Sequence, residues 1–295
     1  MLKRTLLFSN PYHLSAKNKQ LVISDKGKNE KRTVPIEDIG YIVLEHPQIT
    51  FTQSVIQLLA ENNAAVIFCN NRYMPVSMLL HLDNNQTQSQ IFREQIEASA
   101  ALKNNLWRQT VKAKIENQAA LLYLFDLPFK DLLNLAKTVK SGDKTNAEAA
   151  AARLYWRRLF GDSFRRWREG PPPNAFLNYG YAILRAATAR ALTGSGLLPT
   201  LGIFHRNKYN AYCLADDIME PYRPFVDRLV VEITALTRET ELSGEIKQHL
   251  LTLLTEDVLF DKNKRPLMLG LSQTSASLAR CFKGEIRKIS YARLQ

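Results

Sequence analysis

The sequence predicts an α+β fold, in which a small N-terminal β-sheet domain is followed by a larger all-α domain. Short runs of branched and apolar residues, separated by turn-forming residues, fill positions 1–82 and are typical of strands. From position 89 onward, apolar residues recur at steps of three and four, which is typical of helices. The polar segment 83–88 lies between the two patterns and is the predicted linker. We therefore expect domains at 1–82 and 89–295.

One helix interrupts the predicted strands of the first domain. Gln53 to Glu61 places Val55, Leu58 and Leu59 on one face, and Asn62-Asn63 ends it. The predicted strands are Arg4–Phe8, Gln20–Ile23, Arg32–Ile36, Tyr41–Leu44, Ala64–Cys69 and Tyr73–Met78. In the second domain, one helix is expected to begin after Pro171-Pro172-Pro173, with Asn174 as its N-cap. The predicted apolar faces are Leu102 with Leu106; Ile115, Ala119 and Leu122; and Leu177, Tyr181, Leu184, Thr188 and Leu192.

The charge of the chain points to a polyanionic partner. The 295 residues carry a formal net charge of +12, which favours nucleic acid or an anionic membrane surface. No apolar run approaches the roughly 20 residues that cross a bilayer, so no membrane span is expected. The three cysteines, Cys69, Cys213 and Cys281, show no paired spacing and indicate reduced thiols in a cytoplasmic protein.

A cluster of acidic residues and one histidine stands out in this basic chain. His205 is followed by Asp216, Asp217 and Glu220, a concentration of negative charge that would repel a polyanion unless a cation is bound there. Asp217 and Glu220 are three positions apart and share a face if they are helical. Oxygen ligands suit Mg²⁺ and Mn²⁺, and imidazole is acceptable to Mn²⁺. The pattern predicts a divalent-metal site, with Glu148 as the further carboxylate.

Each of these residues has an alternative interpretation. Thr145 and Glu148 have the spacing of a capping box, in which the glutamate bonds back to the start of its own helix. His205 follows two apolar residues and would also fit a structural histidine. The three carboxylates after it would also fit a solvated helix face that pairs with Arg223 and Arg228.

Arginines crowd the segment that follows Glu148. Arginine forks clamp phosphates, and the interleaved aromatic residues, Trp156, Phe160, Phe164 and Trp167, could stack on unpaired bases. A solvated helix face over an aromatic core stripe is the alternative interpretation. The predicted DNA-binding residues are Arg153, Arg157, Arg158, Arg165, Arg166 and Arg223.

Four segments together resemble one known family. They are Glu148–Tyr155, Asn178–Tyr181, Gly202–His205 and Leu214–Pro224. Their order and spacing are similar to those of the CRISPR-associated adaptation integrase, also called CRISPR-associated protein one, and look most like members from type II systems. The strand-rich first half matches the β domain of that family in length and pattern.

The resemblance implies a metal-dependent DNA endonuclease and integrase, which inserts short foreign DNA fragments into a repeat array by attack of a 3′-hydroxyl on a phosphodiester. Its implied catalytic residues and ligands of Mg²⁺ or Mn²⁺ are Glu148, His205 and Glu220. Many relatives have aspartate at the last of these positions. Implied auxiliary residues are Asp217, Asn178 and Tyr179, of which Tyr179 would orient a phosphate or stack on DNA.

The resemblance also implies partners. Family members form homodimers, for which the first domain is the expected dimerisation domain, while the second is the expected catalytic domain. A small ferredoxin-like partner protein bridges these dimers into a heterohexamer that binds double-stranded DNA, both the captured fragment and the repeat array. The RNA-guided effector nuclease of such systems is a further candidate partner. Two other functions stay open: a branched-DNA repair nuclease that uses the same site without integration, and a non-catalytic DNA-binding scaffold.

Overall fold

The computed structural model describes residues 3–25, 27–28, 30–79, 85–167, 169–237 and 239–295. The chain divides into two units, Met1–Asn84 and Asn85–Gln295. The predicted linker at 83–88 lies partly outside the described residues, and its last residue, Gln88, begins a helix. None of the helices in the described ranges combines the length and the apolar character that a membrane span requires.

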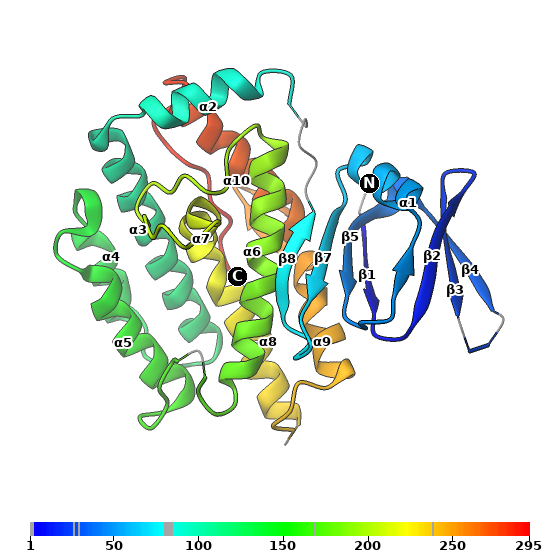
Figure 1. The fold of residues 1–295 in the computed structure, drawn as a ribbon. Coiled ribbons are helices and arrows are strands. Elements are labelled where there is room, and N and C mark those ends of the chain that lie inside the picture. Colours follow the sequence, from blue (N-terminus) through cyan, green and yellow to red (C-terminus); the bar gives the residue numbers. More distant parts are fainter. Residues whose placement is uncertain (1–2, 26, 29, 80–84, 168, 238) are drawn as a thin grey trace. The chain divides into compact units, whose positions relative to one another are not determined.

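Two four-stranded sheets form the first unit (Figure 1). In the sheet with order β1-β5-β7-β8, the first three strands are parallel and the last is antiparallel. In the sheet with order β4-β3-β2-β6, two antiparallel pairs are followed by a short parallel one. The elements are β1 (Arg4–Phe8), β2 (Tyr12–Lys17), β3 (Gln20–Asp25), β4 (Lys31–Pro35), the 3₁₀ turn Ile36–Asp38, β5 (Ile39–Leu44), β6 (Thr50–Phe51), α1 (Gln53–Glu61), β7 (Ala65–Cys69) and β8 (Pro75–Leu79).

Both sheets and α1 share one hydrophobic core. Leu14 and Leu21 reach it from the second sheet, Ile42 and Val66 from the first, and Leu59 from α1. Every residue of β5 is buried, as expected for the middle of a parallel sheet that is covered on both faces. The six predicted strands and the predicted helix are all present, with ends within two residues of the predicted ones.

Strand β2 was not predicted, because its turn carries an unusual residue. Asn18 and Lys19 join β2 to β3, and both have positive φ, at 52° and 60°. A two-residue hairpin turn of this kind normally has glycine at its second position. With lysine at that position, the sequence lacks the usual signal of a hairpin turn. Polar residues in β2 also make the alternation of Tyr12, Leu14 and Ala16 hard to recognise.

Helices dominate the second unit, and the α+β class is confirmed. One feature departs from the all-α prediction, an antiparallel hairpin of β9 and β10. It was missed because each strand has only four residues, and its turn at Asp261 again uses a positive φ without glycine. The elements are α2 (Gln88–Glu97), α3 (Ala100–Leu124), α4 (Lys130–Thr138), α5 (Ala147–Phe160), α6 (Asn174–Gly194), α7 (Cys213–Met219), α8 (Arg223–Leu236), α9 (Gly244–Leu251), β9 (Asp257–Phe260), β10 (Asn263–Pro266) and α10 (Leu267–Phe282), with 3₁₀ turns at Ser141–Asp143, Glu220–Tyr222 and Thr252–Leu254.

Helix α6 is the central helix of this unit. Helices α7, α8, α9 and α10 pack on it, and it is buried on almost every face (Figure 1). At Gly180 a Cβ atom would lie 2.4 Å from Cγ1 of Val226, so glycine is what lets α8 approach this closely. The predicted N-cap at Asn174 is wrong. Pro173 stands at the N-cap, and the Asn174 side chain instead accepts a hydrogen bond from the backbone nitrogen of Trp167, at 3.1 Å.

Candidate active site

The centre of the candidate site is a lysine that lies between two carboxylates. The Nζ atom of Lys114 is 2.6 Å from Oε1 of Glu148 and 2.6 Å from Oε2 of Glu220. Lys114 comes from α3, Glu148 from the first turn of α5, and Glu220 from the 3₁₀ turn after α7. The Lys114 side chain is 12% exposed and the Glu220 side chain is 7% exposed, so this ion pair is largely shielded from water.

The charges in this group stabilise one another. Burial opposes the charged form of Glu220, but the positive charges of Arg223 and Lys114 outweigh it and lower its pKa to about 2. Burial likewise opposes the charged form of Lys114, and Glu220 and Glu148 outweigh it, so the pKa of Lys114 is raised. The site therefore pairs a charged Lys114 with an ionised Glu220 at neutral pH, and Glu148 lies on the other side of the ammonium.

The side chain of Glu148 can contact Lys114 because another residue, Asp143, caps the helix in whose first turn Glu148 lies. The Asp143 carboxylate accepts hydrogen bonds from the backbone nitrogens of Ala147, at 3.0 Å, and Glu148, at 3.1 Å. These are donors that a helix start leaves unsatisfied. The capping box of Thr145 and Glu148 that the spacing allowed is therefore wrong, and the Glu148 side chain points to Lys114.

An arginine holds the other carboxylate of the pair. The Nε atom of Arg223 donates to Oε1 of Glu220 at 2.7 Å, and its guanidinium lies 4.4 Å from the ring centre of Tyr181. The Tyr181 hydroxyl in turn donates to Asp227. Pairing of the helix carboxylates with arginines, the alternative interpretation, thus holds for Glu220. It does not hold for Arg228, which pairs with other glutamates.

His205 lies in a loop that Asp217 organises. Oδ2 of Asp217 accepts from the backbone nitrogen of Phe204 at 2.9 Å, and Oδ1 is 2.5 Å from Nδ1 of His205. Asp217 is fully buried, whereas the His205 side chain is 44% exposed. A Cβ atom at Gly202 would lie 2.9 Å from Oδ2 of Asp217 and 2.3 Å from the His205 carbonyl oxygen, so glycine is needed where the loop closes over the carboxylate. The Phe204 ring stacks on Trp107 at 4.3 Å.

The contact with Asp217 sets the chemistry of the imidazole. Its hydrogen bond raises the pKa of His205 more than partial burial lowers it, and the charge of Glu220 raises it further. When the neutral ring donates its Nδ1 proton to Asp217, Nε2 presents a lone pair. His205 is therefore prepared to act as a ligand or a base through Nε2.

The chemical types of the side chains in the site, carboxylates and an imidazole, are ligands that divalent cations bind. Carboxylate oxygens are the ligands that Mg²⁺ and Mn²⁺ prefer. Oε2 of Glu220 has the ion pair with Lys114 but no well-formed hydrogen bond, so this buried oxygen keeps acceptor capacity. Within the described part of the chain, no group of three or more His, Cys, Asp or Glu side chains is arranged to hold a metal ion. The ammonium of Lys114 occupies the position that the two carboxylates bracket.

Two of the predicted auxiliary residues, Asn178 and Tyr179, lie on α6. Oδ1 of Asn178 accepts from Arg166 at 2.8 Å, and Asn178 is half-buried. Tyr179 is fully buried in the helical core. The ring of Tyr179 therefore has no exposed face on which a DNA base could stack, and its auxiliary role stays a prediction.

Most of the predicted DNA-binding arginines have partners within the protein. Trp156, Phe160 and Phe164 pack on one another, with ring centres 4.7 to 5.9 Å apart, but all three are only half-buried and Trp167 is exposed. Arg153 is exposed on α5. The observed partners are Asp162 for Arg157, Asp131 for Arg158, the carbonyl oxygens of Asp162 and Phe164 for Arg165, Asn174 and Asn178 for Arg166, and Glu220 for Arg223.

Sequence reasoning missed two residues of the site, Lys114 and Asp143. Lys114 stands between Val111 and Gln118 on a buried face of α3, and a charge there needs a buried partner. That is a readable signal, but it does not say which carboxylates are the partners. Asp143 precedes its helix by four residues and caps it through a 3₁₀ turn, outside the usual capping spacing.

Replacing Lys114 with methionine is expected to lower the free energy of unfolding by about 3 kcal/mol, because it leaves two buried carboxylates without their shared cation. Millimolar Mn²⁺ is expected to restore much of this loss, because the ion can take the vacated position. Chemical denaturation with and without Mn²⁺ measures both effects. Lys112→Met, at an exposed position two residues earlier, is the control and should change stability by less than about 0.5 kcal/mol. A Lys114→Met protein that Mn²⁺ leaves unchanged would contradict the assignment.

Comparison with known proteins adds independent evidence. Residues 6–258 match the family described as CRISPR associated protein Cas1. The CRISPR-associated endonuclease Cas1 of Neisseria meningitidis serogroup C (strain 8013) is 40% identical over 280 residues, which are 94% of this chain and 91% of that protein. CRISPR-associated endonuclease Cas1 1 of Francisella tularensis subsp. novicida (strain U112) is 27% identical over 257 residues, 79% of each chain.

Solved structures show the same fold. A casposase bound to integration product has a TM-score of 0.81 at 18% identity, and the match covers 98% of this chain and 92% of the casposase. A Cas1 protein from Thermotoga maritima has a TM-score of 0.76 at 15% identity, over 96% of this chain and 98% of the other. A Cas6-RT-Cas1–Cas2 complex has a TM-score of 0.76 at 20% identity, over 99% of this chain and 36% of the matched chain.

Proposed function

This chain belongs to the family of CRISPR-associated Cas1 proteins, and from that membership we propose that it is a divalent-metal-dependent DNA endonuclease and integrase. In this proposal a DNA 3′-hydroxyl attacks a phosphodiester of a CRISPR repeat, so that a short foreign fragment is inserted into the repeat array. One observation carries the proposal: Glu148 and Glu220, far apart in sequence, converge on a single cationic position.

Glu148 and Glu220 would hold Mg²⁺ or Mn²⁺, with Nε2 of His205 as the third ligand. The ion, when bound, neutralises charge that builds on the phosphate oxygens in the transition state. Arg223 occupies Oε1 of Glu220 and leaves Oε2 to face the cationic position. Asp217 orients the ring of His205 and stabilises the tautomer that keeps the Nε2 lone pair free.

Lys114 has two roles in this proposal. Without a divalent ion, its ammonium forms ion pairs with Glu148 and Glu220 and holds both side chains in place. With an ion bound between the carboxylates, the Lys114 ammonium would instead be available as a hydrogen-bond donor and a positive charge for a phosphate. The negative charge of the two glutamates is thus balanced both with and without a bound ion.

The remaining expectations also belong to the proposal. We assign DNA contacts to the exposed arginines Arg153 and Arg157 and dimerisation to residues 1–82, where Phe51, Tyr73 and Val76 are large exposed apolar residues. Double-stranded DNA, a second copy of the chain, a small ferredoxin-like partner and the RNA-guided effector nuclease are the proposed partners. One similar structure is named as a complex of Cas1 with Cas2, which supports a Cas2 protein as a partner. The proposed location is the cytoplasm, and residues 89–295 form the proposed catalytic domain.

The test of the function is a strand-joining assay. Wild-type protein, the small partner and Mn²⁺ are expected to join a labelled duplex with free 3′-hydroxyl ends to a supercoiled plasmid that carries one CRISPR repeat. A gel that follows the label into plasmid DNA measures joining. Cleavage of branched DNA without joining, indifferent to the partner, would favour a repair nuclease. Binding without either reaction would favour a scaffold.

A further inference from the structure

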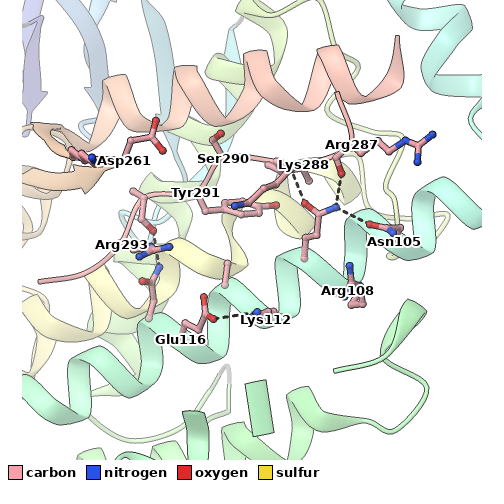
Figure 2. A pocket seen from close by; sticks show the side chains of 16 residues that line it. Asn105, Arg108, Lys112, Glu116, Asp261, Arg287, Lys288, Ser290, Tyr291 and Arg293 are labelled. Atoms are coloured by element: carbon pink, nitrogen blue, oxygen red, sulfur yellow. Dashed lines mark hydrogen bonds and ion pairs between the residues drawn. The ribbon is translucent and has the colours of Figure 1, made fainter. Parts of the chain in front are cut away.

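A basic groove runs along α3 on the second unit, between this helix and the C-terminal segment 287–293 (Figure 2). Its volume is about 770 Å³, and three separate parts of the chain supply its cations: α3, the turn between β9 and β10, and the C-terminal segment. The basic residues that line it are Arg108, Lys112, Lys262, Arg287, Lys288 and Arg293. Against these six stand two acidic residues of its lining, Glu116 and Asp261.

The positive charge of the groove is largely uncompensated. Lys112 and Glu116, one turn apart on α3, form an ion pair at 3.7 Å. Within the described ranges, the other five cations of the groove make no ion pair with a carboxylate, and all five are exposed. Like charges gathered on one concave surface repel one another and attract an anion.

The walls of the groove are fixed by hydrogen bonds between side chains and the C-terminal backbone. The amide of Gln109 donates to the carbonyl oxygen of Arg287 at 2.9 Å and accepts from the backbone nitrogen of Ile289 at 2.9 Å. The amide of Asn117 donates to the carbonyl oxygen of Ala292 at 3.1 Å. These bonds hold the main chain and leave the basic side chains of this segment free to reach a ligand.

The hairpin of β9 and β10 is fixed to the C-terminal segment. The backbones of Leu259 and Arg293 exchange hydrogen bonds of 3.2 and 2.7 Å, which joins the C-terminal segment to β9. Lys262 lies in the turn of that hairpin. The groove is therefore preformed, and a ligand need not order it on binding.

This groove is separate from the candidate active site. Arg108, Lys112 and Glu116 recur every four residues and share one face of α3. Lys114 follows Lys112 by two positions, which turns its side chain by about 200° around the helix axis. The groove and the cationic position between the two glutamates thus lie on opposite faces of α3.

We propose that this groove binds the phosphodiester backbone of duplex DNA, as a second contact away from the reacting ends. Arginine forks and lysine ammonium groups match phosphate oxygens, and Asn105 and Ser290 add neutral hydrogen-bond donors. The two largest apolar side chains of the lining, Ile289 and Tyr291, are buried or half-buried, so the exposed side chains of the groove are mainly basic and polar. The inference rests on the proposed function only in taking DNA as the substrate, and it assigns a site that takes no part in the chemistry.

The test compares two double variants that remove the same charge. Arg287→Ala with Lys288→Ala removes two groove cations whose side chains do not hold the fold. Lys130→Ala with Lys137→Ala removes two exposed cations of α4 and is the control. Fluorescence anisotropy with a labelled blunt duplex of arbitrary sequence, in EDTA, measures affinity over a series of salt concentrations. The groove variant is expected to bind roughly tenfold more weakly, with a slope of log K against log[salt] that is shallower by about 1.8, whereas the control keeps the wild-type slope.

Wild-type affinity and slope in the groove variant would overturn the proposal. If that variant instead loses the small partner protein and keeps DNA, an acidic protein surface occupies the groove and the DNA assignment fails. A photo-crosslinking residue in place of Lys262 should label the duplex, while one in place of Lys130 should not. Since EDTA suppresses metal chemistry, a failure of the proposed reaction leaves all these results unchanged.

Discussion

Replacing Glu220 with glutamine is expected to reduce Mn²⁺-dependent strand joining by at least about 10²-fold, because the change removes the charge that holds a cation at the reacting phosphate. The structure places this carboxylate 2.6 Å from the cationic position and keeps it ionised, with a pKa of about 2. Glu220 is thus charged at neutral pH. Joined product per unit time, with the partner and Mn²⁺ in excess, measures the effect.

Two further variants separate chemistry from folding in that experiment. Glu220 is buried, so Glu220→Gln leaves Lys114 and Arg223 with less negative charge, and its thermal unfolding should be recorded beside its activity. Glu148→Gln tests the same ion from the more exposed side of the pair, and a comparable loss of joining is expected. Glu232→Gln removes a carboxylate that pairs with Arg228 on α8, and should keep wild-type activity. Normal joining by both Glu148→Gln and Glu220→Gln would remove the site assignment.

Asp217→Asn is expected to shift the pH dependence of joining and to lower its plateau by about 10- to 100-fold. Asp217 raises the pKa of His205 above 6.5 by accepting a hydrogen bond from the ring. The protonated ring cannot bind a metal ion, so wild-type activity is low in acid and rises as pH passes the raised pKa. Without the carboxylate, this pKa falls, and the rise in activity moves to lower pH.

Rate measurements from about pH 5.5 to 8.5 test this shift, since that range extends to both sides of the ordinary pKa of histidine. His205→Ala should lose joining at every pH, which shows that the imidazole itself is required. Asp216→Asn is the comparison variant: Asp216 bonds to Arg185 and Asn210 instead of the ring and raises the pKa of His205 only through its charge, so a smaller shift is expected. The same midpoint in wild type and Asp217→Asn would contradict the role given to Asp217.

The residue pattern predicted the architecture well where local chemistry decides it. Strands such as β1 and β5 follow from branched residues between turn-formers, and α1 follows from its apolar face. The hairpin of β2 and β3 escaped prediction because Lys19 adopts a backbone conformation that glycine usually takes. The hairpin of β9 and β10 was too short to show a period, and it gains its order from the C-terminal segment that pairs with it.

The acidic residues of the candidate site were predicted from the sequence, but Lys114 was not. Glu220 and Asp217 could be identified as candidates because two carboxylates three positions apart repel each other unless a cation lies between them. Lys114 is 34 residues from Glu148 and 106 from Glu220, and only the packing of α3 against both brings it there. The DNA contacts of the arginines stay a prediction, and the internal partners of most of these side chains could not be read from the sequence. Composition places Arg166 and Arg223 near an anion, but it cannot tell a phosphate from a carboxylate or amide of the protein itself.

Calorimetric titration with Mn²⁺, without DNA, tests the central claim most directly. If Glu148 and Glu220 bracket a position for a divalent ion, the wild-type protein should bind one equivalent saturably. Glu148→Gln and Glu220→Gln should each abolish this binding, and Lys114→Met, which removes the competing ammonium, should strengthen it. No saturable binding by the wild type, or the same binding in all four proteins, would contradict the account.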